Sequence, residues 1–226
     1  MQNLNEIKNT FDLDQTKKFL RAIKGNKFEC YFKLIMAYQI SRMELVNIEW
    51  KDIDFENSAI TIYPISQKRN TRAYYSWKFK KKENLGRTFP LLPNLKKLLL
   101  DLREQQKFNK ITNKNYDRTN ENFICLKDDG TKLNINTLSR NLRYIARDND
   151  LPQILLSALS NCLESFVCQY ADCYDFYRAW TRFDCKFKKN QNLYKNLNLS
   201  KNKKFLKAIN NLLENATLSR KSDFEM

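Results

Sequence analysis

A chain of 226 residues, 42% of them hydrophobic, has the length and composition of one large domain with its own core. It carries a net charge of +16 and contains no histidine, which excludes Ser-His-Asp and Cys-His hydrolases and HExxH zinc enzymes. With three glycines and no GxxxxGK[ST] or GxGxxG motif, an ATP- or NAD-dependent enzyme is not expected either.

Hydrophobic periodicity predicts a mainly helical chain with a few short strands. The predicted helices span residues 14–24, 27–39, 41–48, 93–104, 136–148, 153–169, 172–182 and 201–214. The predicted strands span residues 51–55, 59–65, 71–79 and 123–126. Asp14 is the candidate N-cap of the first helix, and residues 105–120 are expected to form a polar loop. The predicted fold class is α+β, mainly α-helical with a small antiparallel sheet near residues 51–91.

Two local motifs mark the ends of elements. Ser41 and Glu44 have the S-x-x-E spacing of a capping box, in which each side chain bonds a backbone N–H of the first helical turn. We therefore interpret Ser41 as a helix N-cap. Asp128-Asp129-Gly130 is expected to form a turn.

The excess positive charge lies in two segments. Residues 66–89 have a net charge of +7 and residues 186–221 a net charge of +9, while the rest of the chain sums to zero. The first segment interleaves its cations with tyrosine, tryptophan and phenylalanine, a combination that suits a phosphate backbone beside sugars or bases. We predict duplex DNA as the partner. Solvated lysine-rich stretches are the alternative, and an anionic membrane is disfavoured because no basic amphipathic helix with exposed aromatic residues is apparent.

The candidate nucleic-acid-binding residues come from both basic segments and from one predicted helix. Arg140, Arg143 and Arg147 recur at helical spacing and share a face, which either lines DNA phosphates or is an ordinary solvated stripe. The full candidate set is Lys68, Arg69, Arg72, Lys78, Lys80, Lys81, Lys82, Arg87, Arg140, Arg143, Arg147, Lys186, Lys188 and Lys189.

One series of motifs resembles a known family. Residues 44–55 read ELVNIEWKDIDF, and residues 59–62 read AITI. A strand ending in Lys68, the sequence RTFPL, a leucine-rich helix and the sequence TLSR then follow in that order. This series resembles the catalytic domain of the tyrosine recombinases, or phage integrases, whose first conserved box reads E-L-x-x-L-x-W-x-D-I-D-F and continues into a strand.

The resemblance has a domain-level implication. It is good over residues 14–150 and poor over residues 151–226, which include the basic segment 186–221. It implies a single catalytic-like domain over residues 1–226, and the N-terminal core-binding domain of typical members is expected to be absent.

The resemblance also implies a chemistry. In that family a tyrosine attacks a DNA strand and forms a 3′-phosphotyrosyl link, with neither metal nor nucleotide. Two arginines and a His or Trp bind the phosphate, and a hairpin lysine protonates the leaving 5′ oxygen. We therefore expect no cofactor and no metal.

This chain keeps only part of the implied catalytic set. Lys68 matches the hairpin lysine and Tyr194 the nucleophile. The first arginine position holds Ser41, and Arg42 stands next to it, about 100° further round a helix. The H-x-x-R positions hold only serines, Ser157 and Ser160. Since losing one oxyanion donor costs about 100- to 1000-fold, strand cleavage is expected to be impaired or lost.

Three functional hypotheses follow. The first is an integrase-like DNA-binding protein linked to DNA recombination or to integration of a mobile element, with a degenerate active site. The second is an active, divergent recombinase in which Arg42 and an arginine from residues 140–147 or 178–182 replace the missing cations. The third is a non-catalytic helical interaction module whose last helix, residues 201–214, docks on a partner or on a second copy to form a homo-oligomer.

Compartment and cysteine chemistry complete the expectations. No signal peptide is visible, and no run approaches the roughly 18 apolar residues of a membrane span. A cytoplasmic protein, or one held with DNA in a nucleoid or nucleus, is therefore expected, with no membrane partner. None of the six cysteines forms a CxxC pair. Four of them between residues 162 and 185 leave an all-cysteine zinc site open, but reduced core thiols are favoured.

Overall fold

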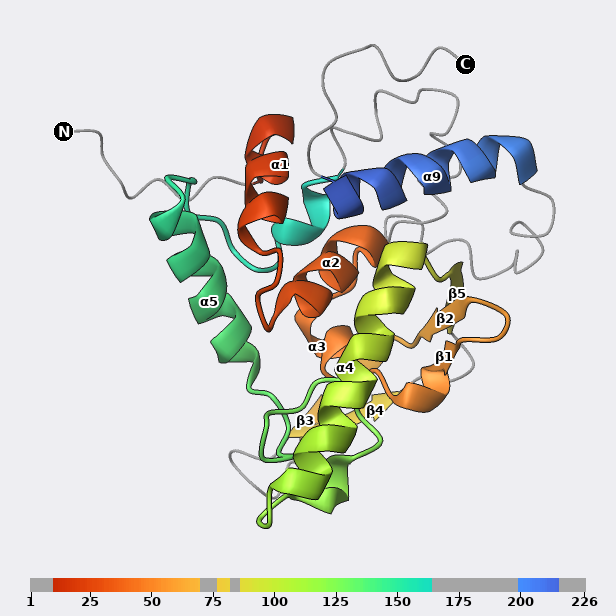
Figure 1. Ribbon diagram of the computed structural model, residues 1–226, viewed down its shortest axis with the longest axis vertical. Helices are drawn as coiled ribbons and strands as arrows, with labels where there is room; N and C mark the ends of the chain where they lie inside the picture. The colour runs from red at the N-terminus through yellow and green to blue at the C-terminus, as the bar shows by residue number, and fades with distance from the viewer. Residues whose placement is uncertain (1–9, 70–76, 82–85, 164–198, 216–226) are drawn as a thin grey trace.

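The computed structural model describes residues 10–69, 77–81, 86–163 and 199–215 (Figure 1). Its α-helices are α1 (Leu13–Ala22), α2 (Glu29–Tyr38), α3 (Arg42–Leu45), α4 (Pro93–Thr112), α5 (Ile135–Asp148) and α9 (Leu199–Asn215). Short 3-10 turns are η1 (Trp50–Asp52), η3 (Arg118–Asn120) and η4 (Leu159–Asn161). The strands are β1 (Ile53–Asp54), β2 (Ala59–Ile62), β3 (Ile65–Arg69), β4 (Trp77–Lys81) and β5 (Arg87–Pro90). The predicted α+β class, mainly helical with a small antiparallel sheet, is confirmed.

The helix α2 forms the centre of the fold. All ten of its residues are buried, including Glu29 and Lys33, whose side chains form an ion pair at 2.7 Å. The Lys33 ammonium also donates to Asn94 Oδ1 at 3.1 Å, so α2 is tied to the first turn of α4. A buried charge is tolerated only when it is paired and hydrogen-bonded in this way. The helices α1, α4 and α9 surround α2 (Figure 1).

The strands form two separate antiparallel units. β1, β2 and β5 make a three-stranded sheet in which Ile60 lies opposite Phe89, and both side chains are buried in the core. β3 and β4 make a two-stranded ladder that pairs Lys68 with Lys78. Pairing with β2 therefore places β5 against the helical core, with Phe89 buried and Arg87 at the start of the strand.

Capping decides where the first helices begin. The N-cap of α1 is Asp12 rather than the predicted Asp14, because Asp12 and Gln15 form a reciprocal capping box. Asp14 lies inside the first turn, where its charge faces the positive end of the helix. The predicted capping box of Ser41 and Glu44 is confirmed, but the helix that it opens, α3, is only four residues long.

The predicted end of α4 at residue 104 is wrong. The helix continues through residues 105–112, which were expected to be a polar loop, and ends at Thr112. Gln106 explains the extension, since its side chain accepts from Trp50 Nε1 at 3.0 Å and donates to the Ile124 carbonyl at 2.8 Å. These long-range bonds hold a polar helical turn against the body of the protein.

Two other predicted elements are also wrong. Residues 123–126 form only isolated bridges, from Phe123 to Glu49 and from Leu126 to Lys132. Residues 153–163 are turns and η4 rather than an α-helix, because the Ser160 hydroxyl bonds the Ser157 carbonyl at 2.8 Å and competes with regular helix. The remainder of that predicted helix and residues 172–182 lie outside the described ranges.

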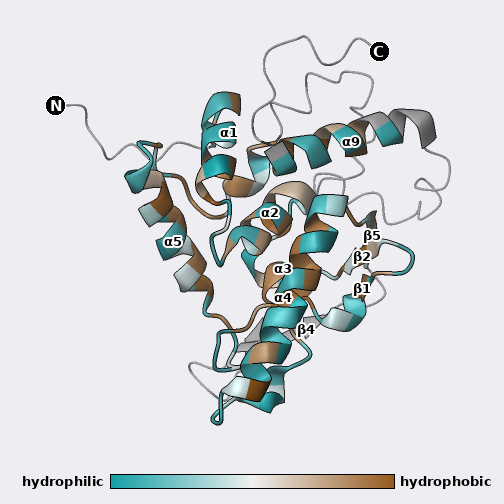
Figure 2. Ribbon diagram, in the orientation of Figure 1, coloured by the Kyte–Doolittle hydropathy of each residue, from teal (hydrophilic) through white to brown (hydrophobic). Residues whose placement is uncertain are grey.

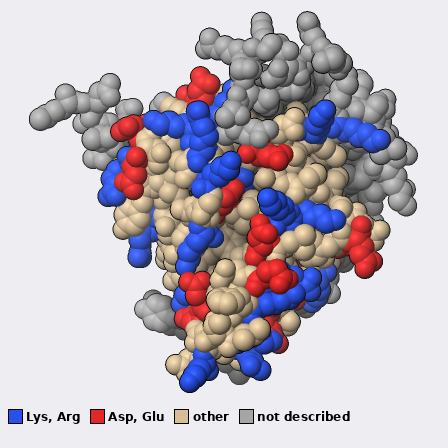
Figure 3. Space-filling model, in the orientation of Figure 1, with Lys and Arg blue, Asp and Glu red and all other residues tan. Residues whose placement is uncertain are grey.

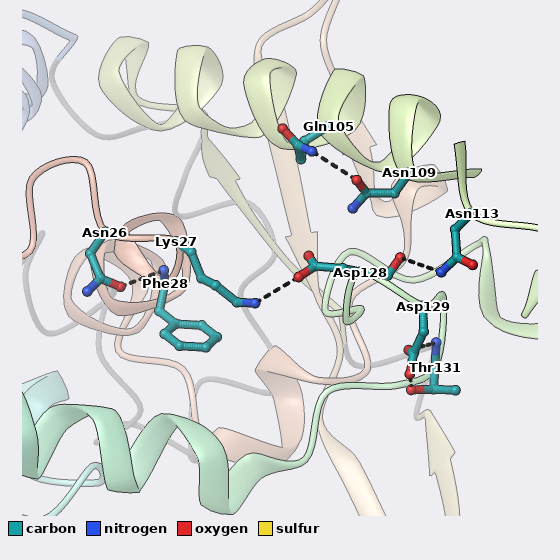
Figure 4. A network of polar contacts seen from close by, with 9 residues as sticks. All are labelled: Asn26, Lys27, Phe28, Gln105, Asn109, Asn113, Asp128, Asp129 and Thr131. Atoms are coloured by element: carbon teal, nitrogen blue, oxygen red, sulfur yellow. Dashed lines mark hydrogen bonds and ion pairs between the residues drawn. The ribbon is translucent and has the colours of Figure 1, made fainter. Parts of the chain in front are cut away.

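The predicted turn at Asp128-Asp129-Gly130 is confirmed and depends on its glycine. Gly130 has a φ of +80°, and a Cβ there would lie 2.4 Å from the Asp117 carbonyl oxygen. Figure 4 shows the polar contacts around the turn, in which Lys27 pairs with Asp128 at 3.1 Å and Thr131 donates to Asp129. No side chain larger than hydrogen fits at this position.

The last described helix closes the core. The apolar face of α9, which includes Phe205, Ile209 and Leu212, is buried, and α9 contacts α1 and α4. Asn210 accepts a hydrogen bond from the backbone N–H of Asn94 at 2.9 Å. In Figure 2 the residues of α5 alternate between apolar and polar along the ribbon, as its buried Leu138, Leu142 and exposed arginines require. Within the described ranges, no helix is long and apolar enough to cross a membrane.

Candidate nucleic-acid interface

The polar groups of Ser41 form hydrogen bonds within the cap of α3. Its hydroxyl accepts from the Glu44 backbone N–H at 3.2 Å and donates to Glu44 Oε2 at 3.0 Å, while its own N–H donates to Glu44 Oε2 at 2.7 Å. The interpretation of Ser41 as an N-cap is therefore confirmed. No positive charge stands at this position.

A cation nevertheless reaches the same carboxylate from another element. Arg87, at the start of β5, places Nη2 3.3 Å from Glu44 Oε1. The guanidinium also lies over the Phe89 ring, 5.5 Å from its centroid. The Glu44 side chain is 4% exposed and that of Arg87 21% exposed, so this is a largely buried ion pair. The opposing carboxylate offsets the charge that Arg87 could offer to a phosphate.

Arg42 precedes Glu44 by two residues in α3 and is not part of this pair. It is the first residue of α3 and is exposed. Among the described residues, no hydrogen bond or ion pair holds the Arg42 guanidinium. The structure therefore brings Ser41 and Arg87 together on Glu44, whereas Arg42 is exposed on the same helical turn and is not part of this contact.

The β3–β4 ladder brings candidate lysines together by register. Lys68 pairs with Lys78, and Ser66 pairs with Lys80. Because positions alternate between the two faces of a strand, the backbone positions of Lys68, Lys78 and Lys80 share one face of the ladder. Arg69 and Lys81 occupy positions on the other face.

The three arginines of α5 lie on a different part of the molecule. Arg140, Arg143 and Arg147 are exposed on the outer side of α5, which lies at the left in Figure 1, whereas the β1–β2–β5 sheet lies at the right. Arg147 pairs with Asp148 at 2.9 Å and lies 5.3 Å from the Tyr144 ring centroid. Arg143 Nε makes only a long bond, 3.5 Å, to the Ser139 carbonyl. Their charge is thus available to solvent.

The serines at the H-x-x-R positions, Ser157 and Ser160, supply no positive charge. Ser157 is exposed, and the partly buried Ser160 bonds Ser157 and Asn161 within its own turn. The remaining candidates lie outside the described residues; these are Arg72, Lys82, Lys186, Lys188, Lys189 and Tyr194.

The described cysteines behave as core thiols. Cys30, Cys125 and Cys162 are free and buried. Burial raises the pKa of the Cys30 thiol to about 12, with a smaller contribution from the Glu29 carboxylate, so the thiol is a poor metal ligand and nucleophile at neutral pH. In the part of the chain that the structure describes, no group of His, Cys, Asp and Glu is arranged to hold a metal ion.

The pairing of Glu44 with Arg87 was not predicted from the sequence. The two residues are 43 positions apart and belong to different elements, so no local spacing signals their contact. The one available signal was a charged residue at the edge of an apolar strand, in the sequence RTFPL. Burial of the neighbouring Phe89 and Leu91 fixes where that charge must lie.

The surface charge is mixed on the face that carries α4. In Figure 3 lysine and arginine side chains alternate with aspartate and glutamate across this face. A DNA-binding face is expected to carry a single sign. The β3–β4 ladder, whose register places Lys68, Lys78 and Lys80 on one face, and the exposed arginines of α5 are therefore better candidates for a nucleic-acid interface than the surface over α4.

Comparisons with known proteins agree with the sequence resemblance. No family model matches the chain. The chain is 28% identical over 109 residues to a tyrosine recombinase XerC-like protein of Caldanaerobacter subterraneus subsp. tengcongensis, a match that covers 45% of this chain and 28% of that protein. The chain therefore spans well under half the length of this curated relative.

Solved structures share the fold at low sequence identity. The XerA recombinase aligns with a TM-score of 0.58 and 13% identity over 89% of this chain and 65% of the other. The Tn1549 transposon integrase in complex with a circular intermediate DNA aligns with a TM-score of 0.57 and 16% identity, over 83% of this chain and 62% of that one. The same integrase with transposon right end DNA gives 0.58 and 15% identity, over 90% and 67%. The chain thus has the tyrosine recombinase fold and, as its motifs predicted, resembles a tyrosine recombinase in sequence.

Proposed function

We propose that this chain is a recombinase-like DNA-binding protein, linked to DNA recombination or to integration of a mobile element, whose strand-cleavage activity is impaired or lost. The observation that carries the proposal is the use of Ser41. At the position where the resemblance calls for a phosphate-binding arginine, both polar groups of a serine are committed to Glu44. A hydroxyl in this state offers neither charge nor a donor to a phosphate.

Several features support DNA as the partner. The solved relatives include an integrase in complex with DNA. In this chain, the ladder register places Lys68, Lys78 and Lys80 on one face, and α5 exposes three arginines. Contacts of this kind go to phosphates and give affinity without sequence specificity. The protein would act where its DNA is, in the cytoplasm, nucleoid or nucleus.

A salt series on a charge-matched pair of variants tests DNA binding. We expect affinity for a short duplex to fall linearly with salt on logarithmic axes, with a slope of roughly 0.9 for each phosphate contacted. Replacing Arg140, Arg143 and Arg147 with glutamine should lower the slope. The control removes the same charge from α1 and the turn that follows it, by replacing the exposed Lys18, Arg21 and Lys24 with glutamine. Equal effects of the two triple variants, or absence of duplex binding, would contradict the proposal.

Cleavage is tested on nicked duplexes that trap a covalent intermediate. The wild-type protein is expected to form no protein–DNA adduct above background. An adduct that disappears in Tyr194→Phe would overturn the loss of activity and leave the DNA-binding proposal intact.

The second candidate function is an active, divergent recombinase. The observation favouring it is that Arg42 directly follows Ser41 in the chain and Arg87 pairs with Glu44, the residue that Ser41 bonds, so two cations come from residues near the position of the missing arginine. This function requires an adduct in the wild-type protein. It further requires that Arg42→Ala abolish the adduct while duplex binding survives.

A homo-oligomer through the last helix is a separate proposal. Because the apolar face of α9 is buried within its own chain, a second copy would have to contact the outer face, where Lys203 and Lys207 are exposed. Sedimentation of the wild-type protein and of a Lys203→Glu, Lys207→Glu variant tests this proposal. A monomer at all concentrations contradicts it.

A further inference from the structure

A hollow lies between the second half of α4, η1 and the segment around residues 116–122. It has a volume of about 420 Å³ and opens to solvent on one side. Residues of both charges and two aromatic rings line it, among them Glu49, Trp50, Arg103, Lys107, Tyr116 and Glu121. None of these residues belongs to the candidate nucleic-acid interface.

Arg103 is held in this hollow by aromatic rings. Its guanidinium carbon lies 5.8 Å from the centroids of both Trp50 and Phe55. The two rings stack on each other at 6.5 Å with an interplanar angle of 29°. A guanidinium at this distance from two rings is attracted by their electron-rich faces.

Arg103 differs from the other cations of the hollow in lacking a counter-charge. Lys51 pairs with Glu49 at 3.0 Å, Lys110 pairs with Glu121, and Lys107 pairs with Glu104 on the same helix. Among the residues that the structure describes, no carboxylate and no hydrogen-bond acceptor engages Arg103. Its planar fork of donors is therefore free for a planar acceptor.

Hydrogen bonds tie together the wall of the hollow behind Arg103. Trp50 donates through Nε1 to Gln106, Gln106 donates to the Ile124 carbonyl, and the Trp50 backbone N–H donates to the Asn122 carbonyl at 2.8 Å. Partial burial raises the pKa of the Tyr116 phenol, so its hydroxyl remains a hydrogen-bond donor at neutral pH. A preformed site loses little entropy when it binds.

We propose that this hollow is a docking site for a peptide segment of a partner protein, and that Arg103 binds an aspartate or glutamate side chain of that segment. The planar guanidinium matches a carboxylate through two parallel hydrogen bonds. Enrichment in Trp, Tyr and Arg is typical of the central residues of protein interfaces.

The charges of the hollow favour a peptide over DNA. Glu49 and Glu121 form part of the lining, so a run of phosphates would meet two carboxylates. A single carboxylate flanked by uncharged residues meets Arg103 without that cost.

The outer face of α4 offers contacts for the residues flanking the carboxylate. Leu100, Phe108 and Ile111 are 41%, 60% and 83% exposed, and helical spacing places Leu100 and Ile111 on the same side of α4 as Lys107, which lines the hollow. The predicted recognition element is therefore an acidic residue followed by aliphatic residues. The proposal goes beyond DNA binding and does not depend on it.

Fluorescence polarisation with labelled octapeptides tests the site. The probes are peptides with a central Glu-Leu and the same peptides with Gln-Leu. Wild-type protein is expected to bind the Glu peptide at least about tenfold more tightly than the Gln peptide, since a charge-assisted bidentate pair is replaced by a neutral contact. Arg103→Gln should abolish that preference, and Arg103→Lys, which keeps the charge without the fork, should restore only part of it.

The control variant is Arg21→Gln, which removes one exposed charge from α1 and should leave the preference intact. A thermal melt establishes that the Arg103 variants are folded. Equal binding of the two peptides, an unchanged preference in Arg103→Gln, or no peptide binding would overturn the proposal. So would a loss of duplex binding in Arg103→Gln without any effect on peptides, because the hollow would then be a DNA contact.

Discussion

Arg87 and Arg103 are two arginines on aromatic rings, and their surroundings give them opposite roles. Arg87 lies over Phe89 and is paired with the buried carboxylate of Glu44. Arg103 lies over Trp50 and Phe55 and has no carboxylate partner among the described residues. The first ties β5 to α3 as part of the fold, and the second is a preoriented donor at the surface. The position of the nearest carboxylate, rather than the residue type, separates structural from binding arginines.

The largest effect on stability is expected from removing the carboxylate of Glu44, which pairs with Arg87. Glu44→Ala leaves a largely buried guanidinium without its counter-charge and also removes half of the capping box of α3. We expect the free energy of unfolding to fall by about 3 kcal/mol. Urea denaturation measures it, with Glu104→Ala as the control because that carboxylate is exposed and should contribute less than about 0.5 kcal/mol. Similar losses in the two variants would contradict the structural role.

Removing the Arg87 guanidinium should lower the free energy of unfolding by a somewhat smaller amount. Arg87→Met keeps an apolar chain over Phe89 but leaves Glu44 buried and unpaired by Arg87, so we expect a loss of about 2 kcal/mol. The Glu44→Ala, Arg87→Met double variant should be more stable than the sum of the two single effects predicts. Strict additivity in urea denaturation would show that the two side chains do not act as a pair.

Arg103 should contribute little to stability. Arg103→Gln removes an exposed cation–π contact, worth about 0.5–1 kcal/mol, and leaves no buried charge behind. The melting temperature of this variant should therefore lie close to that of the wild-type protein. A loss as large as that of Arg87→Met would mean that Arg103, too, is a structural arginine.

The smallest effect is expected from pH in the neutral range. Burial raises the pKa of the Cys30 thiol from 9.0 to about 12 and also raises the pKa values of Tyr31, Tyr38 and Cys125. Folding keeps these groups protonated after the unfolded chain has begun to lose its protons. Stability should therefore change little between about pH 7 and 8 and fall as the pH rises through about 9, where the unfolded thiols ionise and the folded ones do not. Thermal melts across this range measure it, and a rise in stability above pH 9 would contradict the burial of these groups.

Local signals predicted much of this molecule. The capping box at Ser41, the turn at Gly130 and the apolar face of the last helix are each encoded within a few residues, and all three are present. The order of the motifs along the chain also predicted the tyrosine recombinase fold.

Features set by distant contacts were not predicted. The polar second half of α4 is helical because Gln106 bonds Trp50 and Ile124, neither of which is near it in sequence. The pairing of Glu44 with Arg87 and the position of Arg103 over Trp50 depend on the same kind of long-range contact. A local sequence pattern determines how a segment folds more readily than it determines what its side chains meet.

The position of α9 has a consequence for how the protein is made. The helix formed by residues 199–215 covers α1 and α4, which are translated long before it. Until α9 emerges from the ribosome, the surfaces that Phe205 and Leu212 will cover remain exposed to water or to chaperones. The nascent chain is therefore expected to stay sensitive to protease around α1 and α4 until α9 has been synthesised, and to become resistant once α9 packs.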